Sequence, residues 1–147
     1  MDIVIDINTL SPVFDPNNAA HNEFRPVLEY IQNKRGKMVY GGTKYIDELG
    51  RARKFLKIII ELEKADRAVE LACNIVDTEE RRVRRRDPAN GFNDHHIIAI
   101  VIVGRCGTVC SNDRSAHPFF RNNKLYPKHF RRPGIYTGTS SSRSLRN

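Results

Sequence analysis

Short apolar segments rich in β-branched residues alternate along this chain with longer segments of helical periodicity, and this alternation limits the available folds more than any other feature. Strands are predicted at residues 2–6, 37–40, 74–77 and 108–111. Helices are predicted at residues 8–14, 22–33, 44–50, 51–72 and 78–86. Because parallel strands need long crossover connections, the alternation predicts an α/β fold with a central, mainly parallel sheet.

Residues 94–104 fit either a strand or a helix. They are β-branched almost throughout, which favours a strand. Asn93 or Asp94 would cap a helix at its start, and Gly104 would end it, which favours a helix buried on most sides. The residues alone leave both alternatives open.

Length and composition indicate one folded domain. The chain has 147 residues, of which 39% are hydrophobic and 29% are charged, so it can bury a core and is not generally disordered. We expect residues 1–132 to form this domain. Residues 133–147 are basic and rich in Gly and Ser, and they are predicted to form a flexible C-terminal tail.

Nothing in the sequence has the pattern of an export signal or a membrane span. The first residues carry Asp2 and Asp6 where a signal peptide has basic residues, and the longest strongly apolar run, residues 97–104, is too short for a bilayer. The three cysteines fit a reducing compartment. We therefore expect a cytoplasmic protein with no membrane partner.

The basic charge is concentrated at one end of the chain. The net charge is +8, and residues 114–147 contain eight basic side chains and no acidic one. Such a skew favours a polyanionic partner, above all nucleic acid, over a merely solvated tail. The residues expected to contact it are Arg114, Arg121, Lys124, Lys128, Arg131 and Arg132.

Four acidic residues occupy positions where a parallel sheet binds ligands. Asp6 ends the first strand, Asp113 follows the strand at 108–111, Asp94 precedes the apolar segment, and Glu48 follows the second strand, next to Asp47. Ligands of such sheets bind beyond the carboxyl ends of the strands. Clustered carboxylates need a neutralising cation, and their oxygen atoms suit Mg²⁺ or Mn²⁺.

Each acid also has a simpler interpretation. Asp94 is a good helix N-cap, Asp113 is a common turn residue, and Glu48 could be surface charge, with Asp47 competing for its role. Asp6 is the hardest to explain without a function, because an acid directly after Ile-Val-Ile seldom serves packing.

Three segments resemble those of PIN domains. Residues 3–10 (IVIDINTL) resemble the family's opening, in which an apolar strand is followed by Asp-x-Asn and an apolar position. Residues 93–99 (NDHHIIA) resemble the segment in which an acid begins an apolar helix. Residues 109–113 (VCSND) resemble the later strand that ends in Ser/Thr-x-Asp.

The resemblance implies a three-layer α/β/α fold, a helix at residues 94–104, and metal-dependent nuclease activity, usually on RNA. The acidic positions of the family match Asp6, Glu48, Asp94 and Asp113. Asn8 and Ser111 match polar positions that support the first and last acids. Many prokaryotic members are VapC-type toxins that an antitoxin protein restrains, and the resemblance also suggests a homodimer.

Two classes of function follow. The first is an Mg²⁺- or Mn²⁺-dependent endoribonuclease, either a toxin of a toxin–antitoxin pair or an RNA-processing enzyme with the same chemistry. The second is a non-catalytic nucleic-acid-binding module that uses the tail and the basic helix at residues 78–86. That helix is also explained as a solvated face or as the binding site of an acidic antitoxin segment.

Overall fold

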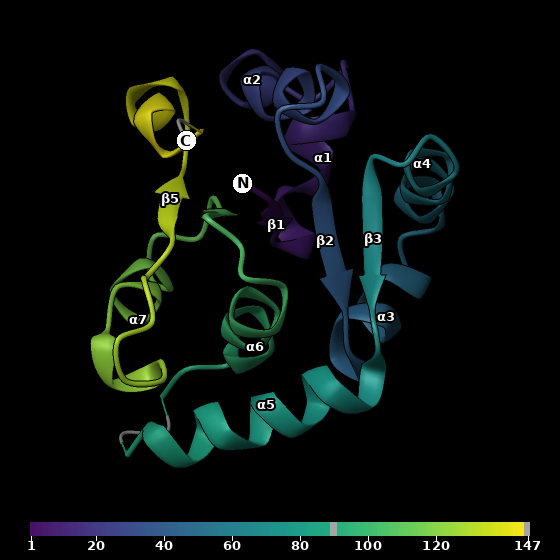
Figure 1. The fold of residues 1–147 in the computed structure, drawn as a ribbon. Helices are drawn as coiled ribbons and strands as arrows, with labels where there is room; N and C mark the ends of the chain where they lie inside the picture. The colour runs from purple at the N-terminus through teal and green to yellow at the C-terminus, as the bar shows by residue number, and fades with distance from the viewer. Residues whose placement is uncertain (89–90, 146–147) are drawn as a thin grey trace.

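The computed structural model describes residues 1–88 and 91–145, and its centre is a parallel β-sheet (Figure 1). The strand order is β3-β2-β1-β4-β5, and every neighbouring pair is parallel. The strands are β1 (Ile3–Ile5), β2 (Met38–Gly41), β3 (Ala68–Leu71), β4 (Thr108–Cys110) and β5 (Gly134–Tyr136). The predicted α/β fold is confirmed.

Helices flank this sheet, as in a three-layer α/β/α fold. The α-helices are α1 (Leu10–Phe14), α2 (His21–Gln32), α3 (Thr43–Gly50), α4 (Arg53–Lys64), α5 (Cys73–Arg86), α6 (His95–Gly104) and α7 (His117–Phe120). Three short 3₁₀ helices are η1 (Ile7–Thr9), η2 (Asn123–Leu125) and η3 (Thr139–Leu145). Within the described ranges, no helix has both the length and the apolar character that a membrane span requires.

The ambiguous apolar segment is the helix α6. It packs against β1, β2 and β3 on one side and against α5 on the other. Seven of its residues, His95 to Val101, are buried, which explains a sequence with almost no polar face. The helix ends where Arg105 adopts a left-handed conformation, with φ of 51°. Burial between sheet and helix thus outweighs the strand propensity of its β-branched residues.

Two predictions in the middle of the chain are wrong. The helix expected at residues 51–72 is α4 followed by β3, because the chain turns at Asp66 with φ of 60°. Residues 74–77, expected as a strand, lie in α5 instead. The apolar side chains of α4 and β3 follow one another closely enough to resemble one long helical pattern, although Val69 lies on an edge strand.

The structure differs from the predicted tail boundary. Residues 134–136 form the edge strand β5, and residues 139–145 form η3 beside it. Tyr136 is fully buried and packs edge-on against Phe24, while Leu145 is also buried. The expectation of flexibility rested on Gly and Ser content, but β5 pairs with β4 and the segment also buries Ile135, which fixes it to the domain. Residues 146 and 147 of the predicted tail lie outside the described residues.

The Tyr136→Phe variant tests whether this segment contributes to stability. The Tyr136 hydroxyl donates a hydrogen bond of 2.6 Å to the carbonyl oxygen of Glu23 in α2. Its loss is expected to lower the free energy of unfolding by about 1 kcal/mol. Urea denaturation measures this change, and a midpoint equal to that of the wild type would show that the segment does not hold α2 in place.

Candidate active site

The sheet has its topological switch point between β1 and β4. The chain continues from β1 to β2 on one side of the sheet and from β4 to β5 on the other. The backbone N–H of Asp6 donates to the carbonyl oxygen of Cys110 at 2.9 Å, so the residues that follow the two strands remain side by side. In parallel α/β sheets this is where ligands bind, beyond the carboxyl ends of the strands.

Asp6 is a buried carboxylic acid at this point, with only 3% of its surface exposed. Burial raises its pKa from 3.8 to about 6, and the negative charges of Asp94 and Asp113 add to the rise. The backbone amide of Asn8 and the hydroxyl of Ser111 act in the opposite direction. A carboxylate in this position is costly unless a proton or a cation neutralises it.

The other predicted acids share this electrostatic environment. Burial raises the pKa of Asp94, the charge of Lys44 lowers it, and Asp113 raises it again. Burial likewise raises the pKa of Glu48, and the charge of Asp94 adds to that rise while Lys44 opposes it. The four carboxylates come from four separate parts of the chain, yet each lies within electrostatic reach of at least one other.

Ser111 connects Asp6 and Asp113 through hydrogen bonds, at the position to which the PIN resemblance gives a supporting role. Its buried hydroxyl donates to Oδ2 of Asp6 at 3.3 Å and accepts a hydrogen bond from the backbone N–H of Asp113 at 3.2 Å. Oδ1 of Asp113 accepts hydrogen bonds from the N–H and hydroxyl of Ser115. Asn8 supports Asp6 through its backbone amide, and its own side chain is exposed.

The structure favours Glu48 over its neighbour as the middle acid. Glu48 is half-buried on α3 and interacts electrostatically with Asp94, whereas Asp47 is exposed. Adjacent helical residues point about 100° apart, so only one of the two faces the cluster.

Paired variants of these neighbours test that choice. Glu48→Gln removes a negative charge from the cluster and is expected to slow the RNA cleavage that the PIN resemblance implies about tenfold or more. Asp47→Asn removes the same charge from the exposed face and is expected to change the rate less than twofold. Initial rates under identical conditions give the comparison, and the reverse order of the two effects would exchange their assignments.

Several neighbours of the acids were not anticipated from the sequence. The buried Tyr45 donates a hydrogen bond of 2.7 Å to the carbonyl oxygen of Ile5, which fixes α3 to the end of β1. The hydroxyl of Thr9 accepts a hydrogen bond of 3.0 Å from the N–H of Asn112, which fixes the loop after β4. Thr9 comes directly after the Asp-x-Asn segment. That position is the one feature of the sequence that could have identified it.

Two positive charges act on the acids from α3 and its C-terminus. Lys44 and Arg51 both lower the pKa of Glu48, and Lys44 also acts on Asp94. The Lys44 ammonium group donates to the carbonyl oxygen of Asn93, directly before Asp94. Neither residue stands out in the sequence, because each lies in a stretch of mixed charge.

The six basic residues predicted to bind nucleic acid are divided by the fold. Arg114 directly follows Asp113 and lies at the acidic end of the sheet. Arg131 and Arg132 line a pocket with Met1 and Thr108, at the amino ends of the strands. The others are exposed between α7 and β5: Arg121, Lys124 and Lys128.

Acidic residues of α5 compensate much of the positive charge of this helix. Arg82 and Arg86 both form ion pairs with Glu79, and Arg84 pairs with Glu80. These pairs favour the solvated face over a phosphate-binding surface for this helix.

The donor set of the cluster suits a hard divalent cation by its chemistry. All four candidate ligands are carboxylates, which Mg²⁺ and Mn²⁺ prefer. In residues 1–88 and 91–145, no group of three or more His, Cys, Asp or Glu side chains is close enough to hold a metal ion directly.

We compared the chain with known protein families, curated proteins and solved structures. No family model, no curated protein and no solved structure matches the chain.

Proposed function

We propose that this chain is an endoribonuclease of the PIN type that depends on Mg²⁺ or Mn²⁺ and hydrolyses RNA phosphodiester bonds. The observation that carries the proposal is the cluster itself. Asp6, Glu48, Asp94 and Asp113 come from four elements and interact electrostatically beyond the carboxyl end of the sheet. A folded protein retains such mutual repulsion most readily where a cation relieves it.

The residues of the chain divide the chemical work. Asp6, Asp94, Glu48 and Asp113 would hold a divalent cation, which activates water and stabilises the charge that develops at phosphorus. The ammonium group of Lys44 is placed beside Asp94 and can attract a phosphate oxygen of the RNA. Ser111 fixes the position of the Asp6 carboxylate relative to the backbone of Asp113 through its two hydrogen bonds.

The non-catalytic binding module receives less support. Its two proposed surfaces were the basic helix and a flexible tail. Three arginines of the helix are ion-paired, and residues 134–145 of the tail are packed on the domain. Ion pairing therefore reduces the free charge of the helix, and packing removes the flexibility expected of the tail.

Cleavage of end-labelled RNA tests the proposal. Purified protein is incubated with Mg²⁺, Mn²⁺ or a chelator, and the Asp6→Asn/Asp113→Asn variant purified in parallel reveals contaminating nuclease. We expect cation-dependent cutting that the double variant lacks. Equal cutting by both proteins would exclude the assigned site, and salt-sensitive RNA binding without any cutting would favour the binding module.

The toxin role, with an antitoxin partner and a homodimeric state, is a further part of the proposal that rests on the family resemblance. Expression in a bacterial host should then arrest growth, whereas expression of Asp113→Asn should not. Normal growth at equal expression levels would favour an RNA-processing enzyme.

A further inference from the structure

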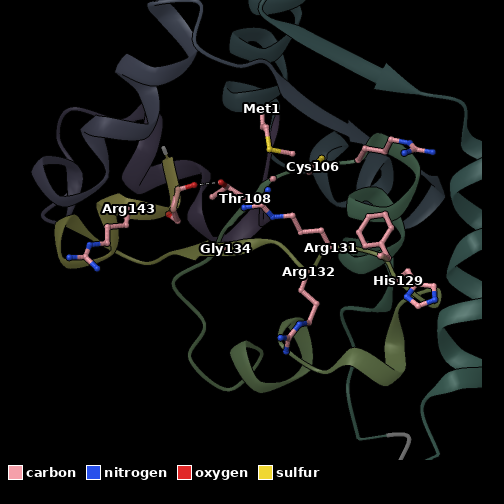
Figure 2. A pocket seen from close by; sticks show the side chains of 12 residues that line it. Met1, Cys106, Thr108, His129, Arg131, Arg132, Gly134 and Arg143 are labelled. Carbon is pink, nitrogen blue, oxygen red and sulfur yellow. Dashed lines mark hydrogen bonds between the residues drawn. The ribbon is translucent and has the colours of Figure 1, made fainter. Parts of the chain in front are cut away.

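A pocket lies at the opposite end of the sheet from the acids (Figure 2). Its volume is about 500 Å³, and it opens at the amino ends of β1, β4 and β5, where Met1, Thr108 and Gly134 line it. Such a volume is typical of sites for small molecules. Asp94 and Arg105 lie at opposite ends of α6, roughly 16 Å apart by the rise of an α-helix, so a ligand here does not reach the acids.

The lining of this pocket carries an uncompensated positive charge. Arg105, Arg131, Arg132 and Arg143 contribute to it, and among the described lining residues none is acidic. Of the ion pairs that the described residues form, none includes these four arginines. Asp2 acts on the neighbouring Cys106, but one of its oxygens accepts the backbone N–H of Lys37. The pocket therefore favours an anion.

The pocket also has a shape suited to more than a simple ion. Figure 2 shows the side chain of Arg131 pointing toward Thr108, with Arg132 and Arg143 on different sides of the pocket. Phe130 forms an aromatic wall, and its ring is fixed by stacking on Tyr126 at 5.7 Å. Guanidinium groups bind phosphate through paired hydrogen bonds, and an aromatic wall suits a flat ring system.

Two residues that line this pocket have left-handed backbone conformations. Arg105 has φ of 51° and His129 has φ of 67°, which are left-handed conformations that disfavour residues other than glycine. They are two of the four described non-glycine residues with positive φ, and both line the pocket. Strain of this kind tends to be retained where it positions functional side chains.

We propose that this pocket is a binding site for a nucleotide phosphate, separate from the acidic site. Arg131, which points toward Thr108, binds the phosphate group, and the wall formed by Phe130 contacts the base or ribose. Two sources share this chemistry: a free nucleoside monophosphate, and the 5′-phosphorylated end of an RNA strand. The assignment gives a role to Arg131 and Arg132, which were expected to contact nucleic acid but lie at the end of the sheet opposite to the acids.

Isothermal titration calorimetry with the full-length Asp113→Asn protein in chelator tests the proposal without any contribution from cleavage or a bound cation. The probes are adenosine 5′-monophosphate, adenosine and inorganic phosphate, followed by one oligonucleotide with a 5′-phosphate or a 5′-hydroxyl end. Binding of the monophosphate but not of adenosine identifies the free nucleotide as a ligand. A preference for the 5′-phosphorylated oligonucleotide alone identifies an RNA end.

Three variants locate the binding. Arg131→Gln should weaken it about tenfold or more, because charge-assisted hydrogen bonds are lost. Arg105→Gly removes another positive charge and also relieves the left-handed backbone conformation, which glycine adopts readily. Weaker binding by a variant of unchanged stability would show that Arg105 contacts the ligand and is not needed for folding. Lys57→Gln, on the exposed face of α4, should leave binding unchanged.

Two results would overturn the proposal: no binding of any phosphate probe, or binding that Arg131→Gln leaves intact. Because the titration needs no cleavage, its outcome is independent of the proposed nuclease activity. A protein that binds the monophosphate but cuts no RNA would retain this site and lose only the catalytic assignment.

Discussion

Replacing Asp6 by Asn is expected to abolish RNA cleavage and, at the same time, to stabilise the fold in the absence of divalent cation. Cleavage should fall about 100-fold or more, because the variant removes a central carboxylate of the cluster. Stability should rise because burial and the charges of Asp94 and Asp113 oppose ionisation of Asp6 in the folded state. If Asp6 had only a structural role, its replacement would not lower the cleavage rate while raising stability. The change in stability would also be the same with and without a divalent cation.

The stability gain has a defined pH dependence. The folded protein holds the Asp6 proton up to a pKa of about 6, compared with the ordinary value of 3.8, so stability from this group is lost as pH rises between those values. At neutral pH the penalty amounts to roughly 3 kcal/mol, which the Asn variant avoids. Urea denaturation at pH 4 and pH 7.5 in chelator measures it.

Asp2→Asn serves as the matched control because Asp2 lies beside the opposite end of the same strand. Its carboxylate accepts a hydrogen bond of 2.9 Å from the N–H of Lys37. This variant should lose stability slightly and cleave RNA at the wild-type rate. If Asp6→Asn were less stable than the wild type at pH 7.5, the account of Asp6 as an electrostatically strained acid would fail.

The second large effect is expected at His96, in a loss of stability at acid pH. His96 is 1% exposed on α6, and neither of its ring nitrogens has a hydrogen-bond partner among the described residues. Burial lowers its pKa from 6.5 to about 3, and the positive charges of Lys44, Arg84 and His95 add to the decrease. The folded state therefore keeps this imidazole neutral over a range in which the unfolded chain binds a proton.

The contribution of His96 to stability is thus complete above pH 6.5 and is lost as pH falls toward 3. The full loss is of the order of 5 kcal/mol, and Asp6 offsets part of it below pH 6. His96→Leu, which places an apolar side chain in an apolar site, should remove this loss, so the unfolding free energy of the variant should rise relative to that of the wild type as pH falls from 6.5 to 4.

His129→Asn is the control, since His129 is exposed and should leave that pH dependence unchanged. An unchanged acid slope in the His96→Leu protein would show that another group is responsible. His95 differs from His96 because its Nε2 lies 2.8 Å from Oδ2 of the buried Asp87. His95 therefore forms a buried hydrogen bond, whereas His96 contributes by packing alone.

The parts of the fold that were predictable are those whose sequence pattern has one physical solution. The run Ile3–Ile5 is too short and too apolar for anything but a buried strand, and it is β1. Residues 94–104 required the family resemblance, because propensity and capping disagreed and burial decided between them. The strand β3 was missed because Val69 and Glu70 are exposed at the sheet edge and carry no buried-strand pattern.

The acids of the candidate site were predictable because each is tied to the end of an apolar element. Asp6 and Asp113 follow β1 and β4, and the parallel topology brings those ends together. Lys44 and Arg51 could not be identified in the same way, since their proximity to the acids depends on how α3 packs. The division of the C-terminal basic residues between two ends of the sheet depends on the path back to β5, which composition does not encode.

Binding of Mn²⁺ to the wild-type protein and to Asp6→Asn tests the central claim most directly, because it needs no knowledge of the RNA target. Paramagnetic resonance of free Mn²⁺ during a titration at pH 7.5 measures the bound ion. The account predicts one or two bound ions for the wild type, displaced by Mg²⁺ and weakened tenfold or more in Asp6→Asn. Equal binding by the two proteins, or none by either, would contradict the assignment of Asp6, Glu48, Asp94 and Asp113 as a cation site.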